Sequence, residues 1–173
     1  LFTVAETWLR QRSIKRILGP FSFNINQEVG LLIEGFKTPP YIMMPNGKEY
    51  YKEAFEKNGY SKSMDTYCYD IAARFSPPPV MRKLIKKLPS ELKVRALNKH
   101  KITEDLETLR LIFNDAWSEN WGFTPFTKKE FSKLGNEMLK IIPINFIQIA
   151  EINEEPVAFI ALIPNINPII HSM

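Results

Sequence analysis

The sequence is poor in the residue types that form disulfides and metal centres. Its 173 residues include one cysteine, Cys68, and two histidines, His100 and His171. A single cysteine excludes an internal disulfide, and so few Cys and His side chains cannot assemble a Cys/His metal cluster. We therefore expect no metal site. Sparse cysteine is typical of a reducing compartment, so we expect a cytoplasmic protein.

Long apolar runs are absent as well. No run approaches the ~20 residues that a membrane-spanning helix needs. The first residues, LFTVAETWLRQRS, lack the basic-then-apolar order of a signal peptide. We expect a soluble protein without a membrane partner. Because Leu1 already lies inside a helical pattern, we treat the chain as a fragment that begins within a domain.

An excess of one charge sign is also nearly absent, since 23 basic and 19 acidic residues give a net charge of +4. This excess is too small to indicate a nucleic-acid partner. One basic set could follow a nucleic-acid backbone, but no aromatic side chains are interleaved with it for base stacking. A solvated helix face is the favoured interpretation. The set comprises Arg82, Lys83, Lys86, Lys87, Lys93 and Arg95.

What is present is ample apolar material, 45% of the residues, in alternating helical and strand patterns. In the first part these patterns predict a helix over residues 1–12, a buried strand over 14–19, a short helix capped by Asn24 or Asn26, and a loop over 37–47. A helix over 48–58 should end at Gly59, which adopts a left-handed conformation at little cost. A strand should follow over residues 60–72.

Three consecutive prolines, Pro77 to Pro79, then predict an extended spacer. Beyond it we expect a short basic helix over residues 81–88, a strand over 91–97 and a helix over 103–117. Thr127 and Glu130 match the capping box of a further helix. Strands over 146–152 and 157–163 should form a hairpin, with Pro156 at the end of its turn.

Two stretches resemble the Gcn5-related N-acetyltransferase family. Strand, two helices and hairpin over residues 92–163 resemble the opening of that fold, and AFEKNGY at 54–60 resembles its closing pattern L-Y-E-K-x-G-F. The chain thus resembles the middle of a bacterial tandem acetyltransferase-like protein. Residues 1–72 would be the C-terminal half of one domain, 73–90 a proline-rich spacer with a short basic helix, and 91–173 the N-terminal half of the next domain.

The resemblance implies an α/β (α+β) fold with a mixed, mostly antiparallel sheet flanked by helices. It also implies acetyl transfer from acetyl-coenzyme A (acetyl-CoA) to an amine acceptor, either a small molecule or a peptide. An unpaired strand edge on each half would favour pairing within the chain or a homodimer. Two alternatives stay open: a non-catalytic binding module that keeps the fold, and a basic interaction domain.

Cofactor contacts are expected only in part. The family holds the pyrophosphate in a glycine-rich turn, whereas the seven glycines here are scattered along the chain. The fragment alone should therefore bind acetyl-CoA weakly or not at all. The resemblance offers Asn26 and Lys48 as cofactor-binding residues. A solvated lysine is the alternative interpretation of Lys48.

The candidate catalytic residue is Tyr51. Active family members carry a tyrosine general acid in the L-Y-E-K-x-G-F pattern, and the matching residue here is Phe55, which has no proton to donate. Tyr51 lies one helical turn earlier and could take over this role. Alternatively, Tyr51 and Phe55 form an i, i+4 aromatic pair that contributes to the core.

The stretch AWSENWGFTPF supplies a candidate substrate-binding wall made of Trp117, Trp121 and Phe123. In the family this link between helices borders the acceptor site, although aromatics in such links also fill cores. Asp115 and Glu119, one turn apart, could act as a base or hold an amine. Solvated surface carboxylates are the alternative.

Overall fold

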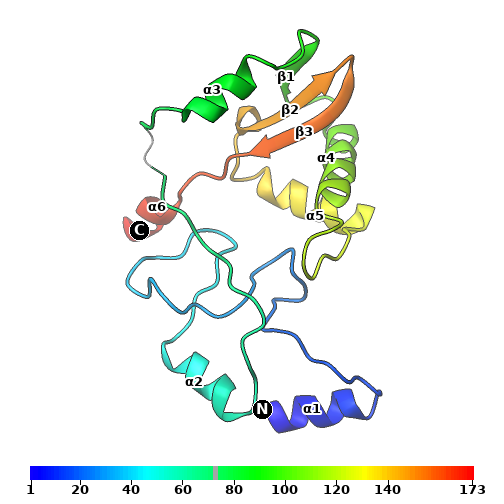
Figure 1. The fold of residues 1–173 in the computed structure, drawn as a ribbon. Coiled ribbons are helices and arrows are strands. Elements are labelled where there is room, and N and C mark those ends of the chain that lie inside the picture. Colours follow the sequence, from blue (N-terminus) through cyan, green and yellow to red (C-terminus); the bar gives the residue numbers. More distant parts are fainter. Residues whose placement is uncertain (72–73) are drawn as a thin grey trace. The chain divides into compact units, whose positions relative to one another are not determined.

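The computed structural model describes residues 1–71 and 74–173, which divide into two compact units (Figure 1). Unit 1 comprises residues 1–69 and 167–173, and unit 2 comprises 70–166. The fold is α+β with an antiparallel three-stranded sheet, which confirms the predicted fold class. The assignment of residues 1–72, 73–90 and 91–173 to parts of two acetyltransferase-like domains stays a prediction.

The sheet of unit 2 has the strand order β1-β2-β3, formed by β1 (Leu92–Ala96), β2 (Ile147–Ile152) and β3 (Glu155–Ala161). The expected hairpin is present, and its turn places Asn153 and Glu154 at positive φ. Pro156 lies opposite Glu151, next to an irregularity in the pairing. Pro156 is thus the second residue of β3 and not the end of the turn, and β3 is an edge strand, where proline is tolerated.

Two helices cover one face of this sheet, namely α4 (Ile102–Ala116) and α5 (Lys128–Met138). The Thr127 side chain caps α5 in the predicted capping box with Glu130. The helices approach closely at Gly135, where an added Cβ would lie 2.5 Å from Leu106 Cδ2. A 3₁₀ turn, η1 (Ile144–Phe146), then leads into β2.

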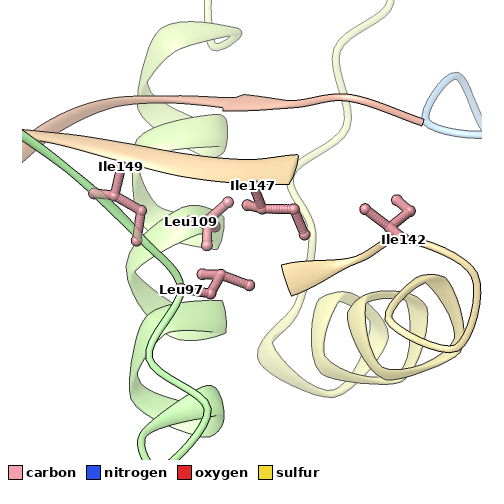
Figure 2. Packing of buried hydrophobic residues seen from close by; sticks show 5 residues of the cluster. All are labelled: Leu97, Leu109, Ile142, Ile147 and Ile149. Carbon is pink, nitrogen blue, oxygen red and sulfur yellow. The ribbon is translucent and has the colours of Figure 1, made fainter. Parts of the chain in front are cut away.

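The core of unit 2 is a small aliphatic cluster between these helices and β2, seen in Figure 2. Ile149 at its centre has no exposed surface. Burying such a side chain contributes about 1.5–3 kcal/mol. The opposite sheet face differs, since Val94 and Ile160 remain 61% and 54% exposed. The cluster consists of Leu97, Leu109, Ile142, Ile147 and Ile149.

The proline segment ends earlier than predicted. Pro77 and Pro78 precede helix α3 (Pro79–Ile85), and Pro79 occupies its first turn. The first helical residue needs no N–H, so proline is tolerated there and its fixed φ suits the helix. The predicted basic helix therefore exists but starts at Pro79, inside the expected spacer.

Unit 1 contains the helices α1 (Phe2–Arg10), α2 (Tyr50–Lys57) and α6 (Asn167–His171). The first two match the predicted helices, and Gly59 has the expected positive φ of 84°. Helix α6 was not predicted. Its residue Asn167 donates a hydrogen bond to the Pro40 carbonyl at 3.2 Å.

Three predicted elements of unit 1 are wrong. Residues 14–19 and 60–71 form no strand, and residue 72 of the second prediction lies outside the described residues. In place of the short helix, Asn24 Oδ1 accepts a hydrogen bond from the Asn26 amide, which makes a local turn. A strand requires a partner, and the described part of unit 1 offers only an isolated bridge between Phe21 and Val29. Asn side chains favour such turns over helix interiors.

Candidate functional site

The junction between α4 and α5 gathers four aromatic rings. Phe113 lies 5.4 Å from Phe126 and 5.7 Å from Trp117, with which it stacks. Phe126 meets Phe131 edge to face at 5.2 Å. Such pairs contribute roughly 0.5–1.5 kcal/mol beyond their buried area. Phe126, which is only 7% exposed, therefore fills the core position of this link.

The backbone of Phe126 is held from α4 by side chains. Asn114 Nδ2 donates to the Phe126 carbonyl at 3.0 Å, and the Phe126 amide donates to Asn114 Oδ1 at 2.9 Å. Arg110 Nη1 donates to the same carbonyl at 3.2 Å. This clamp fixes where the α4–α5 link begins and ends. Phe126 is thereby fixed to α4, whereas Trp121 and Phe123 lie in the loop between the two helices.

The predicted substrate-binding residues lie on this link and remain accessible. Trp117 is 50% exposed and Trp121 is 37% exposed, while Phe123 is half-buried. The two tryptophans are thus not the residues that fill the core. An exposed indole pair is suited to an apolar ligand, but the role of these three residues stays a prediction. Asp115 and Glu119 are both exposed, as expected for solvated carboxylates.

A hollow of about 330 Å³ lies between α4 and α5 and was not predicted. Leu106 and Phe131 supply its apolar part, and Lys128 and Lys129 supply positive charge. Glu107 in its lining forms an ion pair with Arg110 at 2.7 Å, which lowers the pKa of Glu107. The remaining lining residues are Thr103 and Ser132. Lys128 and Lys129 are exposed, whereas Glu107 is half-buried and paired with Arg110.

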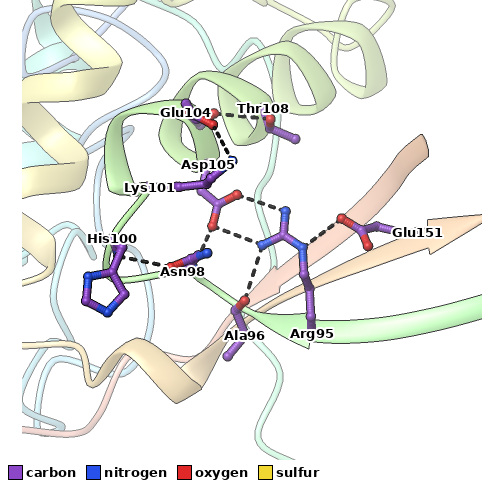
Figure 3. A network of polar contacts seen from close by, with 9 residues as sticks. All are labelled: Arg95, Ala96, Asn98, His100, Lys101, Glu104, Asp105, Thr108 and Glu151. Carbon is purple, nitrogen blue, oxygen red and sulfur yellow. Dashed lines mark hydrogen bonds and ion pairs between the residues drawn. The ribbon is translucent and has the colours of Figure 1, made fainter. Parts of the chain in front are cut away.

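A charged network ties β1, β2 and α4 together (Figure 3). Arg95 donates two hydrogen bonds to Asp105, at 2.8 and 2.9 Å, and a third from Nε to Glu151 at 2.7 Å. The Asn98 amide donates to Asp105 Oδ2 at 2.7 Å. Asp105 is only 4% exposed. Bidentate pairing of this kind is among the stronger hydrogen-bonding arrangements in proteins.

The network holds both partners in their charged forms. Burial opposes the ionisation of Asp105, but hydrogen bonds from Arg95 and the Asn98 amide outweigh it, so the pKa of Asp105 lies below its usual range. Hydrogen bonds to Asp105 and Glu151 raise the pKa of Arg95. Asp105 accepts three hydrogen bonds within the fold, two from Arg95 and one from the Asn98 amide, and is almost fully buried. We therefore assign the network a structural role.

The sequence placed Arg95 only among the solvated cations, and Asp105 was not predicted to be its partner. The alternation of β1 gave no such signal, because the apolar Leu92, Val94 and Ala96 share one face, which the pattern predicts to be buried. The register instead places Arg95 opposite the buried Ile149, on the core side of the sheet. An arginine on the core side of a strand requires a carboxylate partner. Asp105 lies in the first turn of the next helix.

In unit 1, Phe55 and Tyr51 have different surroundings. Phe55 packs edge to face on Phe2 at 4.8 Å and on Tyr60 at 5.5 Å. The ring of Tyr51 meets Tyr50 at 4.9 Å and is 39% exposed. These contacts do not support the alternative of a Tyr51–Phe55 core pair. The hydroxyl role of Tyr51 stays a prediction.

The two proposed cofactor-binding residues lie elsewhere in unit 1. Lys48 is exposed and lies before the N-cap of α2, and its carbonyl accepts a hydrogen bond from the Tyr51 amide at 3.0 Å. Asn26 is half-buried, and its amide donates to Asn24. The geometry thus connects Lys48 to Tyr51 through the backbone. The role of both residues in cofactor binding stays a prediction.

The described residues do not form a glycine-rich phosphate cradle. Gly30, Gly35, Gly59 and Gly122 have positive φ, but each lies in a separate turn. A cradle needs several successive backbone N–H groups directed at one anion. The binding of acetyl-CoA to this part of the protein stays a prediction. Within residues 1–71 and 74–173 there is also no group of three potential metal ligands among His, Cys, Asp and Glu side chains.

Two curated proteins are similar to nearly the whole chain. Over 168 residues, or 96% of the chain, it is 44% identical to protein YghO of Escherichia coli and 37% identical to a bacterial ceramide synthase of Caulobacter vibrioides. The chain spans 43% and 44% of the length of these relatives, respectively. No family model matches the chain, and no solved structure matches it.

None of the helices formed by the described residues combines the length and the apolar character that a bilayer span requires.

Proposed function

We propose that the protein to which these residues belong is an N-acyltransferase that transfers an acyl group from an acyl-CoA to the amine of a long-chain lipid. The single observation that carries the proposal is the 37% identity, over nearly the whole chain, to a protein named bacterial ceramide synthase. A ceramide is the amide of a fatty acid and a long-chain amino alcohol. The acceptor class follows from that chemistry.

The order of elements in unit 2 supports the proposal. The sequence resemblance to the N-acetyltransferase family rests on a strand, two helices and a hairpin, and β1, α4, α5, β2 and β3 occur in that order. The exposed Trp117 and Trp121 support an apolar acceptor, because indole rings bind acyl chains through their large apolar faces. In this proposal they contact the hydrocarbon part of the amine, together with Phe123.

The overall reaction balances without a further reactant. The amine nitrogen forms a bond to the thioester carbonyl, the carbon–sulfur bond breaks, and the proton lost by the amine appears on the released thiol. In the proposal, the pyrophosphate-binding turn is supplied by parts of the longer protein outside these 173 residues. Tyr51 is the proposed proton donor, since its hydroxyl side chain is accessible. Lys48 and Asn26 stay proposed contacts to the cofactor.

The test uses the complete gene product that carries these residues. It is incubated with acyl-CoA of increasing chain length and with a long-chain amino alcohol. Released thiol is followed by absorbance and the amide by mass spectrometry. We expect one thiol to be released for each amide formed. If no amide forms with any acyl-CoA at millimolar concentration, the proposed acyltransferase activity is rejected.

Adjacent tyrosines provide a matched pair for the catalytic role. Tyr51→Phe should lower kcat by about 100-fold if its hydroxyl donates the proton. Tyr50→Phe removes the hydroxyl of the neighbouring, more exposed tyrosine and should leave kcat within about twofold. Equal effects of both changes would remove Tyr51 from the mechanism.

The acceptor wall is tested separately. Trp117→Ala should raise the KM for the amine and leave the KM for acyl-CoA unchanged. Leu111→Ala, at an exposed position of α4, is the control and should change neither KM.

A non-catalytic binding module remains the second candidate. Two observations favour it: Phe55 packs on Phe2 and Tyr60 where the family has its acid, and the described residues lack a phosphate cradle. A module of this kind would gain thermal stability from acyl-CoA or lipid without turning it over. Ligand-induced stabilisation with no amide formed would favour the module over the enzyme.

A further inference from the structure

The short helix α3 and the turn that follows it carry a strong division between apolar and basic side chains. Residues 79–88 are here called the basic amphipathic segment. At 3.6 residues per turn, its five apolar residues occupy one arc of about 140°, and its four cations occupy a separate arc of similar width. The apolar residues are Val80, Met81, Leu84, Ile85 and Leu88. The cations are Arg82, Lys83, Lys86 and Lys87.

Backbone hydrogen bonds continue this arrangement past the end of α3. The Lys86 amide donates to the Arg82 carbonyl at 3.4 Å, and the Lys87 amide to the Leu84 carbonyl at 2.9 Å. The Leu88 amide donates to Ile85 at 3.3 Å. The two arcs therefore persist over the whole segment.

The apolar arc is open to solvent rather than packed in the core. Val80 is 64% exposed, Leu84 59%, Leu88 55%, Ile85 54% and Met81 41%. None of the core residues of unit 2 comes from this segment. Five adjacent apolar side chains on one helical face form a patch of the kind that marks an interaction surface.

The cationic arc determines which partner fits. No Asp or Glu occurs from residue 71 to residue 90, so the four cations have no acidic neighbours in sequence. Among the described residues, none of the four forms an ion pair. Arg82 Nε donates only to the Pro77 carbonyl, at 2.9 Å. The complementary surface must be anionic beside an apolar region.

We propose that the basic amphipathic segment docks on an anionic lipid surface. Such a surface offers both requirements, because the apolar arc enters the boundary between headgroups and acyl chains while the lysine stems extend toward the lipid phosphates. A nucleic acid would neutralise the cations but leave the five apolar side chains in water, and no aromatic side chain of the segment can stack on bases.

This surface contact is different from a membrane span. The expectation of no membrane partner rested on the lack of a long apolar run, and a helix lying in the interface plane needs no such run. The proposal does not depend on acyl transfer. It gives a lipid-modifying enzyme access to its substrate, but it holds equally for a non-catalytic protein.

The test is flotation of the complete gene product with vesicles of phosphatidylcholine alone or with about 30% phosphatidylglycerol. We expect binding to the anionic vesicles only, weakened by raised salt. Lys83→Gln/Lys86→Gln/Lys87→Gln should weaken binding at least tenfold. The matched control, Lys128→Gln/Lys129→Gln/Lys133→Gln, removes the same charge from α5 and should bind as the wild type does.

A second variant tests the apolar arc separately from charge. Leu84→Ser/Ile85→Ser keeps all four cations and should also weaken vesicle binding at least tenfold, with an unchanged circular dichroism spectrum because the two side chains lie outside the core. Wild-type binding by this variant would overturn docking of the apolar arc. Absence of vesicle binding, or equal loss in the α5 control, would overturn the proposal. If the protein binds a single-stranded oligonucleotide but no vesicles, the lipid proposal is overturned and a nucleic acid is the partner of the segment.

Discussion

The two units use similar sequence material to different effect. Among the described residues, all eight buried ones, seven apolar residues and Asp105, lie in unit 2. In the described residues of unit 1 no side chain is buried, although Leu1, Val4, Trp8 and Phe23 are as apolar as the core of unit 2. Apolar content alone therefore does not produce a core.

The difference is explained by strand pairing within each unit. In unit 2 the turn at Asn153 and Glu154 joins β2 and β3, which pair with each other, and β1 pairs with the other edge of β2. The resulting sheet presents a flat apolar face that α4 and α5 cover. In unit 1, the described residues form helices that are joined mainly through the rings of Phe2, Phe55 and Tyr60. A sheet creates a core because it organises many apolar side chains on one face.

The largest expected effect on stability comes from truncating one aliphatic side chain in each unit. Ile149→Ala should destabilise unit 2 by about 3 kcal/mol, because it deletes a fully buried side chain and leaves a cavity. Ile17→Ala, at a position that is 37% exposed in unit 1, should change stability by less than about 0.5 kcal/mol. Urea unfolding measures both.

Tryptophan fluorescence can separate the units in this experiment. A Trp8→Phe background leaves only Trp117 and Trp121 as reporters, both in unit 2, for Ile149→Ala, and a Trp117→Phe/Trp121→Phe background leaves only Trp8 as a reporter, in unit 1, for Ile17→Ala. A loss with Ile17→Ala as large as that with Ile149→Ala would show that unit 1 has a core comparable to that of unit 2, and the comparison would fail.

The second test concerns the charged network. Asp105→Asn should cost unit 2 about 2 kcal/mol, since it leaves Arg95 without its main anionic partner. The loss is smaller than for a fully buried pair because the Arg95 side chain is 37% exposed. Asp115→Asn, at an exposed position on the same helix, should change stability by less than about 0.5 kcal/mol.

The pH dependence of the same pair has a defined sign. The pKa of Asp105 is lower in the folded protein than its ordinary value of about 3.9, so the folded state binds fewer protons on this group. Its stabilisation is complete above pH ~3.9 and is lost as the pH falls through the folded-state pKa. The stability gap between wild type and Asp105→Asn should therefore narrow below about pH 4. A constant gap down to pH 3, measured by urea midpoints, would contradict the assigned pairing.

The sequence predicted helices better than strands, for a physical reason. The helices α1, α2, α4 and α5 were found because apolar spacing, Gly59 and the Thr127 capping box are local signals. The hairpin was found because its partner strand follows in sequence. The strands expected at 14–19 and 60–72 required partners that sequence alone could not supply. For the candidate site, sequence located the aromatic link but not the exposure of each ring, which depends on Phe126 taking the core position.

The third test concerns the aromatic contacts of unit 1. Phe55→Ala removes ring contacts with Phe2 and Tyr60 and should reduce the local stability of α2 by about 1.5 kcal/mol. Hydrogen exchange of α2 amides measures this loss, and unit 2 amides should not change. Tyr51→Ala is the matched control one turn earlier, with its ring partly exposed. A greater loss of α2 stability with Tyr51→Ala would show that Tyr51, and not Phe55, provides the main packing contact.

The smallest expected effect lies at the N-terminus of α5. Thr127→Ala should destabilise unit 2 by about 1 kcal/mol, because the Glu130 amide loses its side-chain acceptor. The Thr127 hydroxyl and amide also donate to Glu130 and lower its pKa, so the same change should raise the pKa of Glu130 toward its ordinary value in an NMR titration. Thr127→Ser keeps the hydroxyl and should restore both properties. A lowered Glu130 pKa that persists in Thr127→Ala would show that the capping box is not its cause. The stability of unit 2 would then rest on its sheet and core and not on a side-chain cap, which α1 and α2 of unit 1 lack.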